Sequence, residues 1–170
     1  MARRACVLAE HDYQDLEAWY PILRLREAGF RVDIVGREGT GPDYKGRFGY
    51  PLRADCHVGE VRDVAYEVVV IPGGWAPDKL RMSPAVVQLV QQAAAAGAVV
   101  AAICHGPSLL VDAGVLRGRQ VTSWPSIRAD LEAAGAMWQD AEVVVDGKLV
   151  TSRKPDDLPA FMRAVLEVAG

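Results

Sequence analysis

Short apolar runs alternate with helical patterns along almost the whole chain. Four of these runs, at residues 4–9, 30–35, 67–72 and 98–103, have the continuous apolar character of fully buried strands. Such strands are typical of parallel sheets that helices cover on both faces. We therefore expect an α/β fold, a doubly wound and mostly parallel sheet, built as a single domain over residues 1–170.

The first helical pattern follows the first strand. Leu16, Trp19, Tyr20 and Leu23 are spaced at i, i+3, i+4 and i+7, which predicts that this face of the helix turns towards the core. Pro21 lies inside the pattern and lacks the backbone N–H that a helix interior needs. We expect the helix to kink or to start late at that point.

Capping residues predict the limits of two further helices. Ser83 followed by Pro84 is a favourable start, and that helix should run to Gly97. A helix from about Pro107 should end at Gly114. The remaining segments predict a loop with a small hairpin at 36–60, a short strand at 121–124, a helix at 127–134, a hairpin around Asp146-Gly147 and a last helix at 156–168.

Composition and charge exclude several classes of protein. Hydrophobic residues make up 51% and charged residues 24%, which is the balance of an ordinary soluble domain. The net charge is −3 and the Lys and Arg residues are scattered, so we expect no nucleic-acid surface. The longest apolar run, 93–104, is interrupted by Gly97 and is too short to span a membrane. We also expect no secretory signal at the N-terminus.

Three cysteines, Cys6, Cys56 and Cys104, are an odd and sparse set that favours reduced thiols and a cytoplasmic location. Cys6 lies in the middle of a strand and fits the role of a small buried hydrophobe. Cys56 is expected to be a loop or edge thiol. With His57 it supplies two metal ligands, which do not make a site. We expect no metal site and no cofactor.

Cys104 is the strongest candidate for chemistry. It ends an apolar strand and precedes a helix, with Gly106 available for a tight turn, as in a nucleophile elbow. A helix N-terminus and a neighbouring histidine predict a Cys104 pKa below the free-thiol value of about 8.5. His105 would then be the general base, since a sharp turn can bring adjacent side chains together. A solvent-exposed turn histidine is the alternative.

Two other strand ends carry residues of interest, and ligands of open α/β sheets bind beyond such ends. Gly73 and Gly74 follow the third strand and offer two backbone N–H groups that could form an oxyanion hole. A plain tight turn is the alternative. Glu17 lies one position after Leu16, on the polar side of the first helix, where a solvated surface glutamate is the usual outcome.

Taken together, these motifs resemble the ThiJ/PfpI family, in the branch of the intracellular protease PfpI. The specific features are Ala-Ile-Cys-His-Gly-Pro at 102–107 and Val-Ile-Pro-Gly-Gly-Trp-Ala-Pro-Asp at 70–78. Segments 17–21, 114–118 and 141–153 extend the resemblance over essentially the whole chain. It implies a flavodoxin-like three-layer sandwich of the glutamine amidotransferase-like type.

The resemblance also implies the roles of individual residues. Cys104 matches the reactive cysteine, Glu17 the glutamate beside it, and His105 the catalytic histidine. Asp78 matches an acidic residue supplied by a neighbouring subunit, so a homo-oligomer is implied. Two positions depart from the family pattern. Asp78 is one methylene shorter than the usual glutamate, and Gln14 replaces an acidic residue.

The activities of the family include peptidase, deglycase and glyoxalase reactions and protection against oxidative stress. The first hypothesis is therefore a hydrolase that acts on small glycated or peptide substrates through Cys104. The second is a redox-responsive stress protein or chaperone in which Cys104 is oxidised, because a stabilised thiolate also favours oxidation. A flavin- or nucleotide-binding relative of flavodoxin is the third. It is disfavoured because no glycine-rich phosphate loop follows the first strand.

Overall fold

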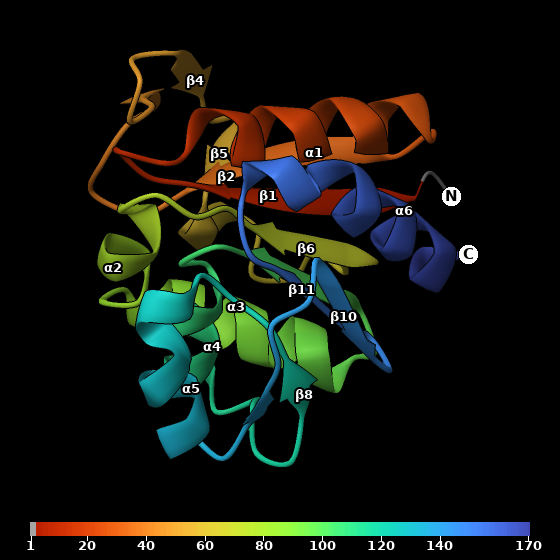
Figure 1. The fold of residues 1–170 in the computed structure, drawn as a ribbon. Coiled ribbons are helices and arrows are strands. Elements are labelled where there is room, and N and C mark those ends of the chain that lie inside the picture. The colour runs from red at the N-terminus through yellow and green to blue at the C-terminus, as the bar shows by residue number, and fades with distance from the viewer. Residues whose placement is uncertain (1–2) are drawn as a thin grey trace.

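A computed structural model describes residues 3–170, and a seven-stranded sheet forms its centre (Figure 1). Neighbouring strands are parallel except for the antiparallel pair β10 and β11. The predicted mostly parallel α/β sheet is therefore confirmed. In spatial order the strands are β10 (Val143–Asp146), β11 (Leu149–Ser152), β7 (Val99–Ile103), β6 (Val68–Ile71), β1 (Arg4–Ala9), β2 (Arg31–Gly36) and β5 (Cys56–His57).

Helices cover both faces of this sheet and complete a three-layer, flavodoxin-like sandwich (Figure 1). On one face α1 (Asp15–Glu27) packs beside α6 (Leu158–Ala169). On the other, α3 (Pro84–Ala95) packs beside α4 (Pro107–Ala113). The short helices α2 (Ala76–Leu80) and α5 (Arg128–Ala133) both contact α4.

Small elements decorate this framework, largely where the sequence predicts them. The 36–60 segment contains the predicted hairpin, and the 121–124 strand is shorter than predicted because the chain turns at Trp124. These elements are β3 (Asp43–Lys45), β4 (Pro51–Arg53), β8 (Gln120–Val121), β9 (Met137–Trp138) and the 3-10 turns η1 (Val58–Glu60), η2 (Pro125–Ile127) and η3 (Pro155–Asp157).

The first helix differs from the prediction in which face it buries. Leu16 and Leu23 are 57% and 58% exposed, whereas Ala18, Ile22 and Leu25 are buried. Both sets have helical spacing, so periodicity alone could not decide which face meets the sheet. Glu17 lies on the buried face, and the prediction of a solvated Glu17 from the pattern was wrong.

The predicted late start of this helix was also wrong. α1 begins at Asp15, where the Gln14 side chain accepts a hydrogen bond from the Glu17 N–H at 2.9 Å. It then continues through Pro21 to Glu27. The buried residues on both sides of Pro21 hold the helix against the sheet, and this packing outweighs the hydrogen bond that proline cannot make.

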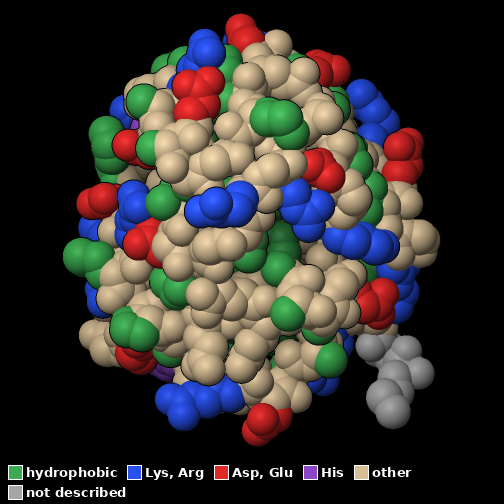
Figure 2. Space-filling view, turned by 90° about the horizontal axis from the view of Figure 1, so that it is seen from below, with side chains coloured by type: hydrophobic (Ala, Val, Ile, Leu, Met, Phe, Trp, Pro, Cys, Tyr) green, Lys and Arg blue, Asp and Glu red, His purple; other side chains and the backbone are tan. Residues whose placement is uncertain are grey.

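The surface agrees with the even charge pattern of the sequence. Figure 2 shows Lys and Arg side chains interspersed with Asp and Glu side chains on one face of the molecule, with no continuous basic patch in that view. Within residues 3–170, no helix is long and apolar enough to cross a membrane.

The turn from β7 into α4 depends on the absence of a side chain at Gly106. Its N–H donates to the Ile103 carbonyl at 2.8 Å, and its φ of −50° is ordinary. A Cβ on this residue would overlap the Ile71 carbonyl oxygen and lie 2.8 Å from the Ile103 oxygen. Glycine is required here by close backbone contact.

We expect Gly106→Ala to lower the free energy of unfolding by roughly 1–3 kcal/mol, the usual cost of overpacking. Urea denaturation at fixed protein concentration measures the effect. Gly59→Ala is the matched control, since Gly59 is exposed, has no positive φ and has open space around its Cβ position. Equal stability of the two variants would contradict the account of this turn.

Candidate active site

Three neighbouring strands end at the same edge of the sheet and bring the candidate residues together. β1 lies beside β6, and β6 lies beside β7, all parallel. Glu17 follows β1 on α1, Gly73 and Gly74 follow β6, and Cys104 follows β7. The carboxyl edge predicted from the sequence is therefore the place where these segments meet.

Gly73 lies between the segment that carries Glu17 and the segment that carries Cys104. Its N–H donates to Glu17 Oε2 at 2.8 Å, and its carbonyl accepts from the Gln14 N–H at 3.1 Å. A side chain on Gly73 would overlap Glu17 Oε2 and come within 2.7 Å of Cys104 Cβ. Glu17 and Cys104 can therefore approach each other only because residue 73 has no side chain.

Cys104 has a strained backbone and a nearly buried side chain. Its φ is +62°, in the left-handed region that residues other than glycine seldom occupy. Such strain costs on the order of 1–3 kcal/mol and is concentrated at functional sites. The residue is 8% exposed, and its sulfur lies 3.4 Å from His105 Nδ1. The structure thus supports the elbow geometry expected from the sequence.

The ionisation of Cys104 differs from the sequence-based expectation. Burial, followed by the negative charge of Glu17, raises the pKa of Cys104 to about 12, although the N–H groups of His105 and Gly74 face the sulfur and act in the opposite direction. The helix that follows Cys104, α4, has only seven residues, and its N-terminus does not offset the effect of burial. The predicted low pKa was wrong, because desolvation outweighs these backbone donors. At neutral pH the resting sulfur is a thiol.

Glu17 is completely buried next to this thiol. Burial raises the pKa of Glu17 to about 8, although the hydrogen bond from the Gly73 N–H and the nearby Cys104 side chain favour the ionised form. Its Oε1 atom has no hydrogen-bond partner among residues 3–170, which adds to the cost of ionisation. Near neutral pH the carboxyl group is mainly protonated, so it can donate a hydrogen bond to a sulfur that loses its proton.

His105 is half-buried, and both of its ring nitrogens have partners. Nδ1 faces the Cys104 sulfur, and Nε2 lies 3.2 Å from the Ser126 hydroxyl. The Trp75 ring packs against it with the ring centroids 5.6 Å apart. Burial and then the positive charge of Arg47 lower the pKa of His105, which keeps the imidazole neutral and able to accept a proton at neutral pH. Ser126 carries no motif and could not be found from the sequence.

The glycine pair differs in part from the predicted oxyanion hole. The Gly73 N–H is already bonded to Glu17 and is not free for a substrate. The Gly74 N–H faces the sulfur together with the His105 N–H. Gly74 has a φ of +77°, and a Cβ there would lie 2.5 Å from the Gln14 nitrogen, so this close turn requires glycine.

Asp78 lies on α2 and is not brought to His105 within the chain. It is exposed and makes no hydrogen bond or ion pair within residues 3–170. Of the apolar residues near it in sequence, Trp75 is exposed, whereas Pro77 is buried inside its own chain. Asp78 is therefore available to another molecule, and Pro77 is not.

The other two cysteines fit the interpretations made from the sequence. Cys6 is fully buried in β1, and burial raises its pKa well above the usual value. Cys56 is partly exposed on edge strand β5, and burial raises its pKa to about 11. Residues 3–170 contain no cluster of three or more His, Cys, Asp or Glu side chains suited to a metal ion.

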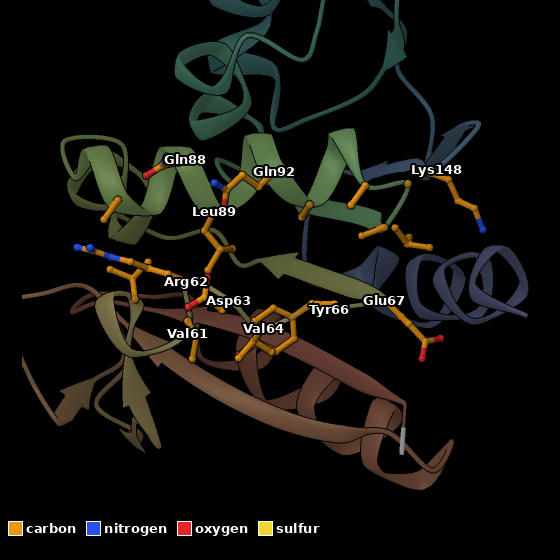
Figure 3. Close-up of a pocket in the computed structure, with 18 of the residues that line it drawn as sticks. Val61, Arg62, Asp63, Val64, Tyr66, Glu67, Gln88, Leu89, Gln92 and Lys148 are labelled. Carbon is orange, nitrogen blue, oxygen red and sulfur yellow. The ribbon is translucent and has the colours of Figure 1, made fainter. Parts of the chain in front are cut away.

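A separate hollow lies at the opposite edge of the sheet. It has a volume of about 570 Å³ and lies between α3 and the segment before β6 (Figure 3). Gln88, Leu89 and Gln92 line it from α3, facing Val64 and Tyr66 (Figure 3). None of the candidate site residues lines it, so this hollow is separate from the candidate site.

The fold and the site together define an α/β protein with a strained, nearly buried cysteine between a strand and a helix. The chain belongs to the DJ-1/PfpI family, whose model matches residues 3–168. A deglycase of Pyrococcus horikoshii is 42% identical over 162 residues, which cover 95% of this chain and 96% of that protein. General stress protein 18 of Bacillus subtilis is 39% identical over 168 residues, or 98% and 97% of the two chains.

The similarity extends to solved structures. Drosophila melanogaster DJ-1beta superimposes with a TM-score of 0.91 at 31% sequence identity, covering 100% of this chain and 92% of that one. The resemblance inferred from the two sequence motifs is thus confirmed at the level of family and fold.

The raised pKa of Glu17 predicts how stability depends on pH. The folded state keeps this proton up to about pH 8, whereas the unfolded chain releases it near the usual value of 4.5. Stability should therefore fall as pH rises between these values, by at most about 1.4 kcal/mol per pH unit from this group. Glu17→Gln removes this contribution, so its stability relative to the wild type should increase with pH and level off above about pH 8.

Urea denaturation at about pH 5, 7 and 9 measures this difference. Glu167→Gln, a change at an exposed position of α6, is the control and should leave the pH dependence unchanged. If the Glu17→Gln and wild-type curves run parallel, Glu17 does not hold a proton in the folded protein.

Proposed function

We propose that this protein is a cysteine hydrolase of the PfpI type that acts on small carbonyl adducts of amines and thiols, as a deglycase does. The observation that carries the proposal is the arrangement at Cys104. Its φ is +62°, its sulfur lies 3.4 Å from a neutral His105 nitrogen, and Glu17 lies buried beside it. A nucleophile, a base and a proton donor are thus within reach of one reacting atom.

The chemistry follows from the protonation states. His105 Nδ1 accepts the thiol proton as the sulfur bonds to the carbinol carbon of the adduct, which carries the amine or thiol leaving group. The protonated Glu17 carboxyl and the Gly74 and His105 N–H groups, which face the sulfur, stabilise its negative charge. The bond to the leaving group breaks as His105 returns the proton to it, and water then takes the place of the sulfur, which releases the carbonyl compound as its hydrate and restores the thiol.

The burial of the sulfur favours small substrates. Because Cys104 is only 8% exposed, a folded protein chain cannot easily reach its sulfur, whereas a small glyoxal or methylglyoxal adduct can. The relative from Pyrococcus horikoshii is named a deglycase, which agrees with this substrate class. Short peptides remain the second substrate class. We also propose a cytoplasmic location, which the three free cysteines support.

A redox-responsive stress protein is the second candidate function. A protonated carboxyl beside Cys104 can also donate to an oxidised sulfur, and the Bacillus subtilis relative is named a general stress protein. In this case peroxide would add oxygen to Cys104 before it modifies Cys6 or Cys56, and the purified protein would turn over no carbonyl adduct.

Self-association is part of the proposed function. Leu16, Leu23, Phe48 and Tyr50 are all more than half exposed, and together with Trp19 they surround a surface hollow of about 510 Å³. Clustered exposed apolar side chains of this kind mark contact sites. We propose that a second copy of the chain covers this apolar patch in a homo-oligomer.

The site is proposed to be completed between subunits. Asp78 is exposed and has no partner in its own chain within residues 3–170, and Trp75, near it in sequence, packs against His105. A neighbouring copy could therefore present its Asp78 carboxylate to the exposed side of His105. That carboxylate would stabilise the imidazolium that forms when His105 takes the thiol proton.

We expect turnover of methylglyoxal-derived hemithioacetals and aminocarbinols, at a rate above that for a fluorogenic peptide or free methylglyoxal. Cys104→Ser should reduce every enzymatic rate by at least about 100-fold, because the hydroxyl is a much weaker nucleophile. Product formation is followed after subtracting the decay that buffer alone causes.

Cys56→Ser is the matched control for loss of a thiol, and it should retain the wild-type rates because Cys56 lies on β5, away from Glu17 and His105. Equal adduct turnover by the wild type and Cys104→Ser would rule out the hydrolase proposal. Peptide cleavage without adduct turnover would instead identify a peptidase.

Subunit mixing tests the role of Asp78. Cys104→Ala and Asp78→Ala should each be nearly inactive, but exchanged subunits form mixed dimers with one fully wild-type site. With random pairing half of the dimers are mixed, and half of their sites are intact, so about a quarter of the wild-type activity should return. The measurement is adduct turnover after subunit exchange.

Cys104→Ala mixed with His105→Ala is the control, since these two residues lie on one turn of one chain and cannot be completed by a neighbour. Mass spectrometry confirms the exchange in both mixtures. Recovery that stays at the level of this control would leave Asp78 as an ordinary surface carboxylate.

A further inference from the structure

Ser126 holds the side of His105 that faces away from the reactive sulfur. Its hydroxyl oxygen lies 3.2 Å from Nε2, while Nδ1 on the opposite side of the ring faces Cys104. Ser126 belongs to η2, far from the elbow in sequence, and neither motif of the site includes it. Ser126 therefore contacts the imidazole nitrogen that does not face the thiol.

The loop that carries Ser126 is fixed to the elbow by a chain of hydrogen bonds. The Trp124 N–H donates to the Cys104 carbonyl at 2.9 Å. The Ser123 hydroxyl donates to the Trp124 carbonyl at 2.9 Å, and the Trp138 indole N–H donates to that hydroxyl at 3.0 Å. Ile127, on the other side of Ser126, is buried. The position of the Ser126 hydroxyl is therefore set by the same framework that sets Cys104.

We propose that Ser126 is a positioning residue whose hydroxyl accepts the Nε2–H of His105 and thereby keeps the Nδ1 lone pair directed at the Cys104 thiol. A neutral imidazole carries one proton, on one of its two nitrogens. With that proton on Nε2 and bonded to Ser126, Nδ1 is the free acceptor. This inference rests on the proposed function because it takes His105 as the base that accepts the Cys104 proton.

The same hydrogen bond supports the charged intermediate. When the Cys104 proton moves to Nδ1, the imidazolium has two N–H groups, one facing the thiolate and one facing Ser126. The hydroxyl oxygen accepts from the second. Because this acceptor is already in place, the ring needs no rotation during the transfer.

Ser126 also explains how the short Asp78 side chain could act on this site. The Ser126 hydroxyl has a proton of its own after it accepts from Nε2–H, and it is exposed at the surface. A carboxylate from a neighbouring copy can accept that proton without reaching His105 itself. The Ser126 hydroxyl would then make up for the one methylene by which Asp78 is shorter than a glutamate.

The direct test is the protonation of the His105 ring in ¹⁵N-labelled protein. The chain has three histidines, so a His105→Gln variant assigns its signals. In the wild type we expect a protonated Nε2 and an unprotonated Nδ1. Ser126→Ala should mix the two tautomers, and Ser126→Thr, which keeps the hydroxyl, should restore the wild-type pattern.

The second readout is the pH dependence of Cys104 alkylation by iodoacetamide, followed by mass spectrometry. Loss of one hydrogen bond to the imidazolium should lower the rate at neutral pH by about threefold to tenfold and shift the profile upwards by about half to one pH unit. Ser126→Thr should follow the wild type. In adduct turnover, Ser126→Ala should lower kcat with little change in KM.

The outcomes separate this inference from the proposed function. If Ser126→Ala leaves both the tautomer and the alkylation profile unchanged, or if Ser126→Thr behaves like Ser126→Ala while both remain folded by circular dichroism, the positioning role is wrong. Full adduct turnover by Cys104→Ser would remove the proposed hydrolase but would not alter these two readouts, which need no substrate.

Discussion

The close approach of three chain segments at Gly73 is the constraint on which the site depends. The Gly73 peptide unit connects both ways to the start of α1, since its N–H binds Glu17 and its carbonyl binds the Gln14 N–H. The Cys104 β-carbon occupies the space where a side chain at residue 73 would lie. A residue without a side chain thus allows a buried carboxyl group and a buried thiol to share one small space.

This crowding determines the charge state of the whole site. Burial raises the pKa values of Glu17 and Cys104 and lowers that of His105, so the resting site is close to neutral. In the proposed reaction, charge separation occurs only when the thiol proton moves to His105. The groups that would meet those charges are the Gly74 N–H, the His105 N–H and the Ser126 hydroxyl, and all three are already in place in the resting site.

The sequence predicted the sheet and the elbow because their signals are local. A strand with a continuous apolar run, such as 98–103, buries all of its side chains when helices cover both faces of the sheet. The residue after such a strand then lies at the edge of the sheet. The burial of Glu17 and the exposure of Leu16 could not be derived in this way, because two faces of α1 have helical spacing and tertiary packing chooses between them. The prediction of a lowered Cys104 pKa was wrong because desolvation is a property of the assembled site. Ser126 meets His105 through the path of a loop, which no spacing of residues encodes.

The edges of the central sheet have a consequence for how copies of this chain can meet. One edge is β5, with two residues, and the other is β10, with four. Such short edges offer few unpaired backbone groups to an incoming strand. In the proposed homo-oligomer, copies would therefore meet through their side chains, without adding strands to one another's sheets, and each copy would keep its own sheet intact when it separates.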